Sequence, residues 1–556
     1  MAVDVDPNLR TDRPTERRRS EASQGRTILF FLPSLDYLRF FQTALEQLPE
    51  RGHRVHLAIG RGSHGPREQA WLDGMVGHAN FVYEIVEHFH DRHSKRSSAL
   101  RRGLEYLRSL EPSYTWRAGA RKREKRSPAV VRLLVRLPGL RKLPAVRRVA
   151  RMLSAIDRML PSPGHAAEYV ERLRPDLVAL CDHGAPGSLN STYVKAAKQL
   201  GIPTVICVAS WDNLTTRQQM REIPHSVLVW NETQVKEAAE IHGVPPDRVV
   251  VTGAPSFDEW FSRTATPRGS FLERVGLDPD KPVILWVGGA LKRTERTEAQ
   301  FAADWIRQLR SSSHPVLREA GVLLRPHPYR VEEWTKVDVS GLGNAVVWPR
   351  EDMTMPIETE QRADYYDSIF HSLAVVGVNS SAMIEASIIG RPVLALTEPG
   401  FYDSQLGTYH FSYLLDSNGG PVRVVESFDE GLEALGAILE GHDEDAERVR
   451  RFVQDFVRPR GLDRPAVPIF VEALEHVAAT PASEERTPIW ITAARAVVVP
   501  LLWVYDLVAG TIPYRTLRLV RRHVAPWLRV RGKRLKRFVL VWLRAAVRQR
   551  LARLRV

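Results

Sequence analysis

The chain has 556 residues, which is too many for one compact core, so we expect two domains with additional segments. Its apolar share of 44% is typical of a globular protein. The two cysteines, Cys181 and Cys207, form neither a disulfide framework nor a zinc site, and they favour a reducing compartment. Residues 1–25 are polar and rich in Arg, Asp, Glu and Pro, which predicts a disordered tail and excludes a signal peptide there.

Positive charge is concentrated in two segments of the chain. The formal net charge is +14, but residues 92–158 alone hold 20 Lys and Arg against 4 Asp and Glu. Residues 511–556 hold 15 Lys and Arg and no acidic residue, so the rest of the chain is net negative. Both segments interleave arginine with aliphatic residues, which is typical of amphipathic helices on an anionic membrane. Nucleic acid, which would favour an evenly basic groove, is the weaker alternative.

Apolar residues in the first basic segment recur at intervals of three and four, as on one face of a helix: Val146, Val149, Leu153, Ile156 and Leu160. Nearer the end of the chain, the apolar stretch Ile489–Ile512 has only ten uncharged residues between Arg495 and Asp506. A membrane-spanning helix needs about 20. We therefore expect residues 481–556 to associate with a membrane without crossing it, and the alternative is a pair of helices packed on the protein body.

Short apolar strands alternate with helices through the first half, which indicates a doubly wound parallel sheet. The expected strands are residues 28–32, 55–59, 81–86, 176–181, 204–208, 227–230 and 249–252. The expected helices are residues 36–48, 165–173, 188–200 and 232–242. A basic insertion at residues 87–163 interrupts this order and shows no strand pattern.

The second half repeats the alternation. Its expected strands are residues 283–287, 322–324, 346–348, 373–376 and 393–396, and a helix is expected at residues 298–309. The chain then becomes helical from about residue 429 to 477, and we expect this part to cross back and brace the first half. With a linker near residues 253–267, two α/β halves of this kind place a ligand cleft between them.

The stretch Leu373–Leu396 is predicted to form a strand, a tight turn, a helix and a second strand. Ser380 or Ser381 can cap the helix, and Gly390 followed by Pro392 ends it. The loop after a buried parallel strand faces the ligand crevice, and N–H groups at a helix start attract anions. An ordinary β-α-β unit, in which the serines only cap the helix, explains these residues equally well.

Four motifs together resemble GT-B glycosyltransferases, and within them the surface-polysaccharide and CDP-glycerol glycerophosphotransferase-like branch. They are Gly253-Ala254-Pro255-x-x-Asp258, Gly288-Gly289, Arg325-Pro326-His327-Pro328 and Ser380-Ser381-x-x-x-Glu385-x-x-x-x-Gly390-x-Pro392. The first of these is also similar to a signature of UDP-GlcNAc 2-epimerases. The resemblance covers residues 26–478 and implies an α/β protein with two Rossmann-like doubly wound domains facing a cleft.

The expected organisation has four parts. Residues 1–25 form a disordered tail, and residues 26–260 form an N-terminal Rossmann-like acceptor domain with the basic helical insertion 87–163. Residues 261–480 form a C-terminal Rossmann-like nucleotide-donor domain. Residues 481–556 form the amphipathic membrane-associating tail.

Transfer of a sugar leaves a nucleoside diphosphate, whose charge must be stabilised by cations and N–H dipoles. The resemblance implies a phosphate contact at His327-Pro328, and Glu385 is positioned to accept a hydrogen bond from a ribose hydroxyl. The candidate donor-binding residues are Gly288, Gly289, Lys292, Arg293, Arg325, His327, Ser380, Ser381 and Glu385. Because these basic groups can neutralise the phosphates and no Asp-x-Asp pair lies at a plausible strand end, neither a metal nor a cofactor is expected.

The acceptor hydroxyl needs a general base, which should come from the first half of the chain. Asp182 and His183, directly after a predicted strand, are the preferred pair, and Asp36 follows the first strand in the equivalent place. A helix N-cap explains an Asp at position 182 about as well. The segment Ser210-Trp211-Asp212-Asn213 and His410 are further candidates for the cleft.

The sequence therefore predicts a metal-independent glycosyltransferase at the inner face of the cell membrane, on its cytoplasmic side. It would move a sugar from a nucleotide-sugar donor to a lipid-linked or polymeric cell-surface glycan. The alternatives are a CDP-glycerol-type glycerophosphotransferase, a UDP-GlcNAc 2-epimerase-like enzyme that needs no acceptor, and a non-enzymatic membrane or nucleic-acid adaptor.

Overall fold

The computed structural model describes residues 25–60, 66–86, 92–111, 120–137, 143–160, 164–181, 184, 191–350, 359–442 and 446–482. The chain divides into two units, and the first of them, Met1–Asp157 with Pro161–Glu485, contains nearly all of these residues. The predicted tails, residues 1–25 and 481–556, lie almost wholly outside the described residues.

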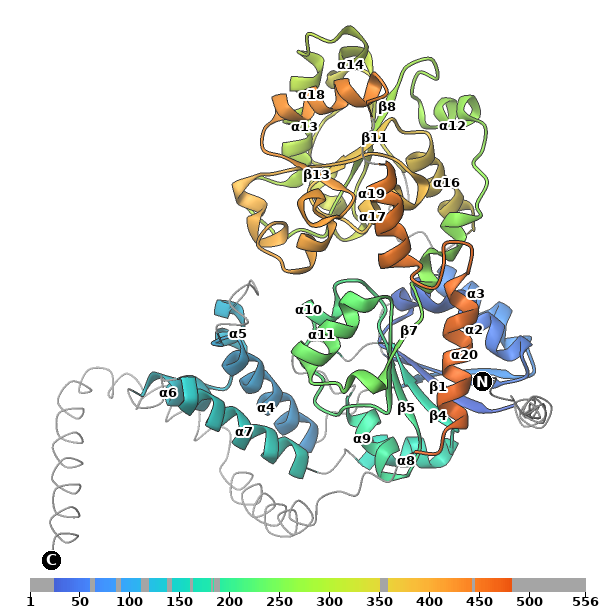
Figure 1. The fold of residues 1–556 in the computed structure, drawn as a ribbon, viewed down its shortest axis with the longest axis vertical. Helices are drawn as coiled ribbons and strands as arrows, with labels where there is room; N and C mark the ends of the chain where they lie inside the picture. Colours follow the sequence, from blue (N-terminus) through green and yellow to red (C-terminus); the bar gives the residue numbers. More distant parts are fainter. Residues whose placement is uncertain are drawn as a thin grey trace, which may run out of the picture. The chain divides into compact units, whose positions relative to one another are not determined.

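The first half is built on a seven-stranded parallel sheet with the order β3-β2-β1-β4-β5-β6-β7 (Figure 1). Its strands are β1 Thr27–Leu32, β2 Arg54–Gly60, β3 Phe81–Val86, β4 Leu177–Leu180, β5 Thr204–Cys207, β6 Ser226–Val229 and β7 Val249–Val251. All seven predicted strands are present, with ends within one residue of the prediction. The strand order reverses between β1 and β4, and a ligand crevice in an open α/β sheet forms at such a point.

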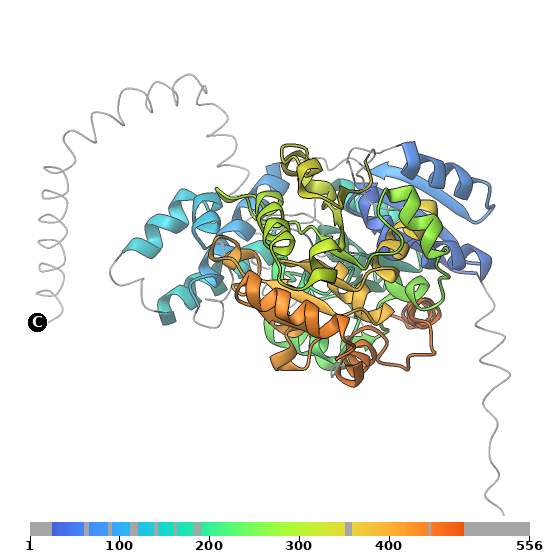
Figure 2. The ribbon, with the colours of Figure 1, turned by 90° about the horizontal axis from the view of Figure 1, so that it is seen from above.

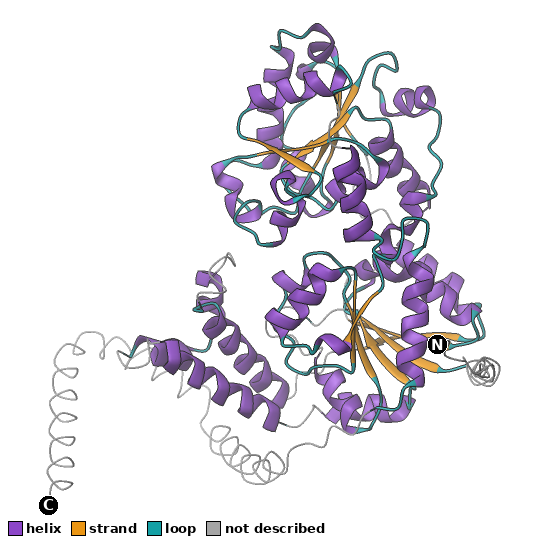
Figure 3. Ribbon diagram, in the orientation of Figure 1, coloured by secondary structure: helices purple, strands orange, loops and turns teal. Residues whose placement is uncertain are grey.

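Helices cover both faces of this sheet (Figure 3). They are η1 Leu35–Tyr37, α2 Leu38–Glu50, α3 Pro66–Val76, α8 Gly164–Leu173, α9 Ser191–Gln199, α10 Asn213–Thr216, α11 Glu232–His242, η4 Pro246–Arg248 and η5 Pro255–Phe261. Strand β1 is buried on both sides, so Phe30 packs with one layer of helices and Phe31 with the other. A strand that is covered on both faces has a continuous apolar sequence, and this is why β1 could be predicted from the sequence.

The second half is built on a six-stranded parallel sheet with the order β10-β9-β8-β11-β12-β13. Its strands are β8 Val283–Val287, β9 Gly321–Arg325, β10 Ala345–Val347, β11 Ala374–Gly377, β12 Val393–Leu396 and β13 Val422–Val425. The sequence analysis missed β13. Because this strand lies at the edge of the sheet and exposes Arg423, its pattern is not the apolar run of a central strand.

Helices also surround the second sheet. They are α12 Arg268–Val275, α13 Glu298–Arg310, α14 Pro315–Glu319, η6 Pro328–Arg330, α15 Val331–Trp334, η7 Ser340–Leu342, α16 Thr359–Phe370, α17 Ala382–Ile389, η8 Pro399–Ser404, η9 His410–Leu414, η10 Asp416–Asn418, α18 Phe428–Leu439, α19 Ala446–Phe452 and the π-helical turn η11 Val453–Val457. The chain continues into α20 Ala466–Ala479, which packs on the first half. The predicted helix at residues 298–309 is α13, whose start is fixed by a capping box between Thr297 and Gln300.

The last described helix, α20, crosses back to the first half, as the sequence analysis expected. Its apolar face joins the core under the first sheet, where the Phe470 ring lies 5.5 Å from the Phe41 ring of α2. At the other end of the helix, Glu475 accepts hydrogen bonds from Arg51 and pairs with His53 at 2.9 Å. The two halves are therefore tied together by α20 as well as by the linker.

Asp258, from the Gly-Ala-Pro-x-x-Asp motif, holds this crossing in place. Its Oδ1 accepts hydrogen bonds from the Arg458 guanidinium at 2.8 Å and from the backbone N–H of Ala466 at 2.9 Å. Its Oδ2 accepts the N–H of Val467 at 2.7 Å. One carboxylate thus caps the start of α20 and neutralises a buried arginine.

Within the insertion, the described residues form helices α4 Arg92–Arg108, α5 Ala120–Arg126, α6 Ala129–Arg136 and α7 Leu143–Met159, which lie together as one group in Figure 2. The predicted apolar stripe of α7 faces inward, with Val146 and Leu153 buried in a small core with Leu104 and Leu107 of α4. This stripe stabilises the insertion itself and is not free to contact a membrane.

Part of the insertion's charge is also structural. Buried Glu105 of α4 accepts hydrogen bonds from Arg221 at 3.0 Å and from the N–H of Gln219 at 2.9 Å, which joins the insertion to the first half. Arg101 of α4 is paired with Asp157 of α7 at 3.2 Å inside the insertion. No helix among the described residues is long and apolar enough to cross a membrane.

Candidate functional site

Three of the sequence motifs meet at one edge of the second sheet. Gly288 follows β8, Arg325 ends β9 and is followed by His327, and Ser380 follows β11. These strands are neighbours in the order β9-β8-β11 and run parallel, so their carboxyl ends open at the same place. A cavity of about 190 Å³ lies there. Six of the nine predicted donor-binding residues line it: Gly288, Arg325, His327, Ser380, Ser381 and Glu385.

The glycines allow these loops to pack closely. A Cβ atom on Gly288 would lie 2.7 Å from the backbone N of His327, and one on Gly289 would collide with the carbonyl oxygen of Asn379. The N–H of Gly288 donates to the Arg325 carbonyl at 2.8 Å, and that of Gly289 donates to Glu298 Oε2 at 2.9 Å. The expectation that both N–H groups face a phosphate is therefore not met, because both already have partners within the protein.

Arg325 is held by helix α16. Its Nη1 donates to Asp364 Oδ2 at 2.8 Å and to Ser368 Oγ at 2.6 Å, and its guanidinium lies over the Tyr365 ring at 5.0 Å. Asp364 also accepts the Trp348 indole N–H at 2.7 Å. Because Asp364 balances its charge, Arg325 orders the wall of the cavity and contributes less net positive charge than the sequence suggested.

His327 is neutral at physiological pH. Burial, together with the positive charges of Arg39 and Arg330, lowers the pKa of His327 to about 4. Its Nδ1 accepts the backbone N–H of Tyr329 at 3.2 Å, so the ring proton is on Nε2. The side chain can therefore offer one N–H to a ligand in the cavity at any pH above about 5.

The start of helix α17 contributes two hydroxyl groups. Ser380 Oγ accepts the N–H of Ala382 at 3.3 Å and is thus the capping serine, whereas Ser381 makes no capping bond and its side chain is exposed. At the other end, Gly390 terminates the helix in the left-handed conformation with φ of 80°, as predicted. Ser381 is the hydroxyl better placed to donate to a ligand.

Glu385 lies one turn further along α17, where it accepts the Tyr365 hydroxyl at 2.6 Å. Burial raises the pKa of Glu385 to about 7, while the Tyr365 hydroxyl and Arg39 act in the opposite direction. The carboxylate is consequently close to its midpoint at neutral pH. This makes its charge sensitive to any ligand group that approaches it.

Two of the predicted phosphate-binding cations lie outside the cavity lining. Lys292 Nζ pairs with Asp403 at 3.2 Å and also donates to the Asp403 carbonyl. Arg293 is 73% exposed and lies 3.7 Å from Glu332. Tertiary partners of this kind, more than a hundred residues away for Lys292, leave no trace in the local sequence.

The first half supplies a cation that the sequence analysis did not identify. Arg39 of α2 lines the same cavity, and its charge affects the pKa values of both His327 and Glu385. Near it, Arg362 of α16 bridges the halves by donating to Glu259 at 3.0 Å and to Gln42 at 2.6 Å. Because these residues lie within ordinary helices and in no motif, the sequence carried no signal for them.

The predicted general bases are less well defined by the structure. Asp182 and His183 lie outside the described residues. Asp36 lies in η1 beside Ser34 and does not line the cavity, although its charge contributes, after burial, to raising the pKa of Tyr329 next to the His327 loop.

Only some of the remaining candidates for the cleft line the cavity. Ser210 and Trp211 line the cavity, whereas Asp212 accepts a hydrogen bond from Thr216 Oγ1 and is absent from the lining. Buried His410 packs edge-on against Trp211 at 4.9 Å, and burial lowers its pKa. Its position supports a packing role. Among the described residues, no group of His, Cys, Asp and Glu is arranged to hold a metal ion.

Two parallel α/β sheets, with a cavity at the carboxyl ends of the second one, define the chain as an α/β protein. Residues 205–460 match the model of the family described as CDP-Glycerol:Poly(glycerophosphate) glycerophosphotransferase. This match confirms, over those residues, the resemblance inferred from the motifs.

The comparison with solved structures gives weak similarities to the chain. A glycosyltransferase from Rickettsia africae is similar with a TM-score of 0.46 and 10% identity over 82% of this chain and 100% of that one. A UDP-GlcNAc 2-epimerase from Neisseria meningitidis bound to UDP-GlcNAc gives 0.45 and 13% over 81% and 99%. The wall teichoic acid polymerase TagF gives 0.41 and 12% over 82% and 90%. No curated protein sequence matches the chain.

Proposed function

We propose that the chain transfers a group from a nucleotide-activated donor to a lipid-linked or polymeric acceptor of the cell surface. The observation that carries the proposal is the single cavity at the ends of β8, β9 and β11. It brings together three loops that the sequence marks as phosphate-binding, and Arg39 joins them from the other half. Neutral hydrogen-bond donors and a cation that line one cavity can stabilise the negative charge of a departing phosphate group.

In this proposal the cavity binds the donor through its phosphates and ribose. The Nε2–H of His327 and the hydroxyl of Ser381 donate to phosphate oxygens, and Arg39 balances their charge as the leaving group departs. Glu385 accepts a ribose hydroxyl, and Tyr365 holds its carboxylate in position. These residues all bind and orient the donor, and none of them needs to change covalently.

The acceptor would enter from the first half, whose aromatic residues Trp211, Trp230 and Phe40 contribute to the lining of the cavity. A base there must take the proton of the attacking hydroxyl. Asp182 and His183 remain our predicted pair, and Asp36 remains the alternative.

The transferred group is either a sugar or a glycerophosphate. We place the sugar first, as the sequence analysis does, while the family match over residues 205–460 favours CDP-glycerol as a specific second candidate. The two reactions leave different nucleotides. Sugar transfer breaks the bond between the anomeric carbon and oxygen and releases a nucleoside diphosphate. Glycerophosphate transfer breaks the phosphoanhydride and releases a nucleoside monophosphate.

Identification of the released nucleotide therefore tests the proposal. The purified chain is incubated with UDP-sugars and with CDP-glycerol, with and without an extract of lipid-linked acceptors, and the nucleotides are separated by anion-exchange chromatography. Acceptor-dependent release of UDP supports sugar transfer, and acceptor-dependent release of CMP supports glycerophosphate transfer. Conversion of a UDP-sugar to an epimer without an acceptor, or no release from any donor, would contradict both.

Membrane contact is the second part of the proposal, and helix α6 supports it. Val130 and Leu133 of this helix are 62% and 65% exposed, and Leu137, the residue after its end, is 46% exposed. Exposed Arg136 and Arg147 lie in the same group of helices. An apolar face within a basic surface is typical of a helix that lies in the interface of an anionic bilayer.

Replacing Leu133 by Glu tests this contact. Sedimentation with vesicles containing phosphatidylglycerol should fall, whereas the matched change Leu200→Glu, at a 40% exposed position outside the insertion, should have no effect. Equal sedimentation of both variants and the unmodified chain would show that α6 is not the contact.

A further inference from the structure

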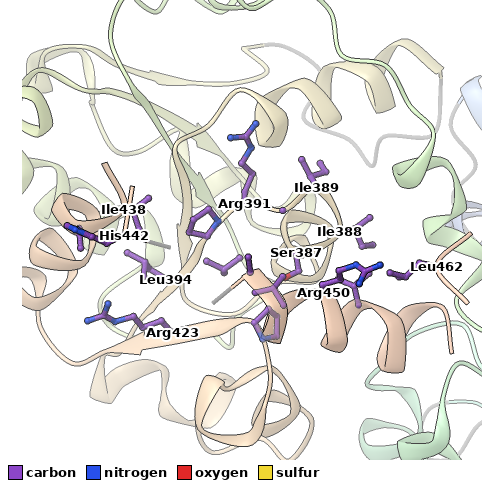
Figure 4. Close-up of a pocket in the computed structure, with 18 of the residues that line it drawn as sticks. Ser387, Ile388, Ile389, Arg391, Leu394, Arg423, Ile438, His442, Arg450 and Leu462 are labelled. Atoms are coloured by element: carbon purple, nitrogen blue, oxygen red, sulfur yellow. The ribbon is translucent and has the colours of Figure 1, made fainter. Parts of the chain in front are cut away.

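Two cavities lie at opposite edges of the second sheet. One is the cavity of about 190 Å³ at the carboxyl ends of β8, β9 and β11, which we call the donor cavity. The other, of about 570 Å³, lies at the amino-terminal ends of β12 and β13. Figure 4 shows its Arg423 and Arg450 side chains on opposite sides and pointing apart, so they do not form one anion site. The buried polar group without an assigned role is instead the carboxyl of Glu298, next to the donor cavity.

Glu298 is the first residue of α13 and is only 3% exposed. Its Oε2 accepts the backbone N–H of Gly289 at 2.9 Å, and its Oε1 is buried without a hydrogen-bond partner among the described residues. The indole N–H of Trp286 is near enough to influence the carboxyl but makes no well-formed hydrogen bond with it. A buried carboxyl with an unsatisfied oxygen opposes folding, so a functional role for it has to be considered.

The contact with Gly289 fixes the loop that follows β8. Gly289 lies so close to the carbonyl oxygen of Asn379 that a Cβ atom at position 289 would collide with it. Asn379 comes directly before Ser380, and Gly288 comes directly before Gly289; both Gly288 and Ser380 line the donor cavity. Glu298 therefore holds the residue at which two of the three loops of the donor cavity touch.

We propose that Glu298 is a positioning residue for the donor, which holds the loop after β8 against the Ser380 loop and so keeps the donor cavity in its binding shape. Glu298 is not among the residues that line this cavity, and it acts through Gly289. This role deepens the proposed function and rests on it, since the ligand is the same nucleotide-activated donor.

The neutral acid is the form that suits this role. Burial raises the pKa of Glu298 to about 8, while the Gly289 N–H, Trp286 and the charge of Arg330 oppose this effect and the charge of Glu333 adds to it. Arg330 of η6 and Glu333 of α15 are thus the charged groups that act on Glu298, and they pair with each other at 3.7 Å. Below about pH 8 the acid can accept the Gly289 N–H without placing a negative charge near the donor phosphates. Above that pH the ionised carboxylate would repel them, so donor affinity should fall as pH rises.

The test uses the full-length chain with the variants Glu298→Ala and Glu298→Gln. Glutamine keeps a carbonyl oxygen for the Gly289 N–H but never ionises. The matched control is Gln300→Ala, because the Gln300 side chain accepts the N–H of Thr297 at the start of the same helix and makes no contact with Gly289. Hydrogen exchange of peptides covering residues 287–293 is measured by mass spectrometry, and calorimetry gives the affinity for UDP and CDP at pH 7 and pH 9.

At pH 7 we expect Glu298→Ala to exchange the loop amides faster and to bind the nucleotide about 10-fold more weakly. Glu298→Gln and Gln300→Ala should match the unmodified chain in both measurements. At pH 9 the unmodified chain should bind up to about 10-fold more weakly than Glu298→Gln, because the carboxyl is then mostly ionised. Ionisation of Glu385 and of the nucleotide affects both proteins equally and cancels in this ratio.

Unchanged loop exchange and affinity in Glu298→Ala would overturn the proposal, and so would an equal loss of affinity in Glu298→Gln and Glu298→Ala at pH 7. Equal affinities of Glu298→Gln and the unmodified chain at pH 9 would overturn the role of the neutral acid, and this comparison can be made even where Glu298→Ala does not fold. No nucleotide binding by the unmodified chain would contradict the proposed function itself, together with the donor role of Glu298.

Discussion

Replacing Tyr365 by Phe should change the pH dependence of nucleotide binding. The Tyr365 hydroxyl donates to Glu385 at 2.6 Å and opposes the effect of burial, which raises the pKa of that carboxyl to about 7. A hydrogen bond to a charged group contributes about 1.5–3 kcal/mol, and one pKa unit corresponds to about 1.4 kcal/mol. Loss of the hydroxyl should therefore raise the pKa of Glu385 by about one to two units.

The consequence is a loss of affinity that depends on pH. If the ionised carboxylate is the form that accepts the ribose hydroxyl, affinity falls as pH decreases through the pKa of Glu385. At pH 7.5 the Tyr365→Phe variant should bind UDP or CDP roughly 3- to 25-fold more weakly than the unmodified chain, and the difference should become small above about pH 9.5.

Calorimetric titrations between pH 6 and 9.5 measure this shift. Tyr366→Phe is the matched control, because Tyr366 is the next residue of α16 and stacks on Phe370 without contacting Glu385. Ionisation of the ligand phosphates affects all three proteins equally. Identical midpoints for Tyr365→Phe and the unmodified chain would refute the reasoning.

Three further predictions concern the frame of the site. Gly288→Ala should abolish nucleotide binding, measured by calorimetry, without unfolding the chain, because the new Cβ atom would lie 2.7 Å from the His327 backbone. The control Gly269→Ala should leave nucleotide affinity unchanged, because a Cβ atom there would have no neighbouring atom within 4 Å. Asp258→Ala should lower the free energy of unfolding in urea by about 3–5 kcal/mol, because buried Arg458 loses its ion-pair partner, and a loss below about 1 kcal/mol would contradict that role. His327→Asn should retain nucleotide affinity better than His327→Ala, because the Asn side chain still offers an N–H donor. The pKa of His327 is about 4, so the nucleotide affinity of the unmodified chain should show no titration midpoint attributable to His327 between pH 5.5 and 8.

The arrangement of the strands could be predicted because buried parallel strands are apolar on both faces. The motifs after β8, β9 and β11 were placed at one sheet edge for the same reason: parallel strands end together. The edge strand β13 exposes Arg423, so it lacks the continuous apolar run and was not predicted. Local sequence was thus sufficient where burial was complete, and insufficient where a strand has only one neighbour.

The site chemistry was predicted less well, because it depends on distant partners. Lys292 seemed available for phosphate but is engaged by Asp403, and the Gly289 N–H is taken by Glu298. The apolar stripe of α7 suggested a membrane surface, yet Val146 and Leu153 pack against α4. The partners of Lys292 and of the α7 stripe lie far away in the sequence, and Glu298 lies nine residues after Gly289, in the next helix.

Titration of UDP and CDP into the unmodified chain, the double variant His327→Ala/Ser381→Ala and Lys292→Ala tests most directly whether the cavity at the ends of β8, β9 and β11 binds the donor phosphates. His327 and Ser381 line this cavity and Lys292 does not. We predict that the unmodified chain and Lys292→Ala bind one of the nucleotides equally, and that the double variant binds it at least about 10-fold more weakly. No binding to the unmodified chain, or unchanged affinity in the double variant, would contradict the assignment of the site.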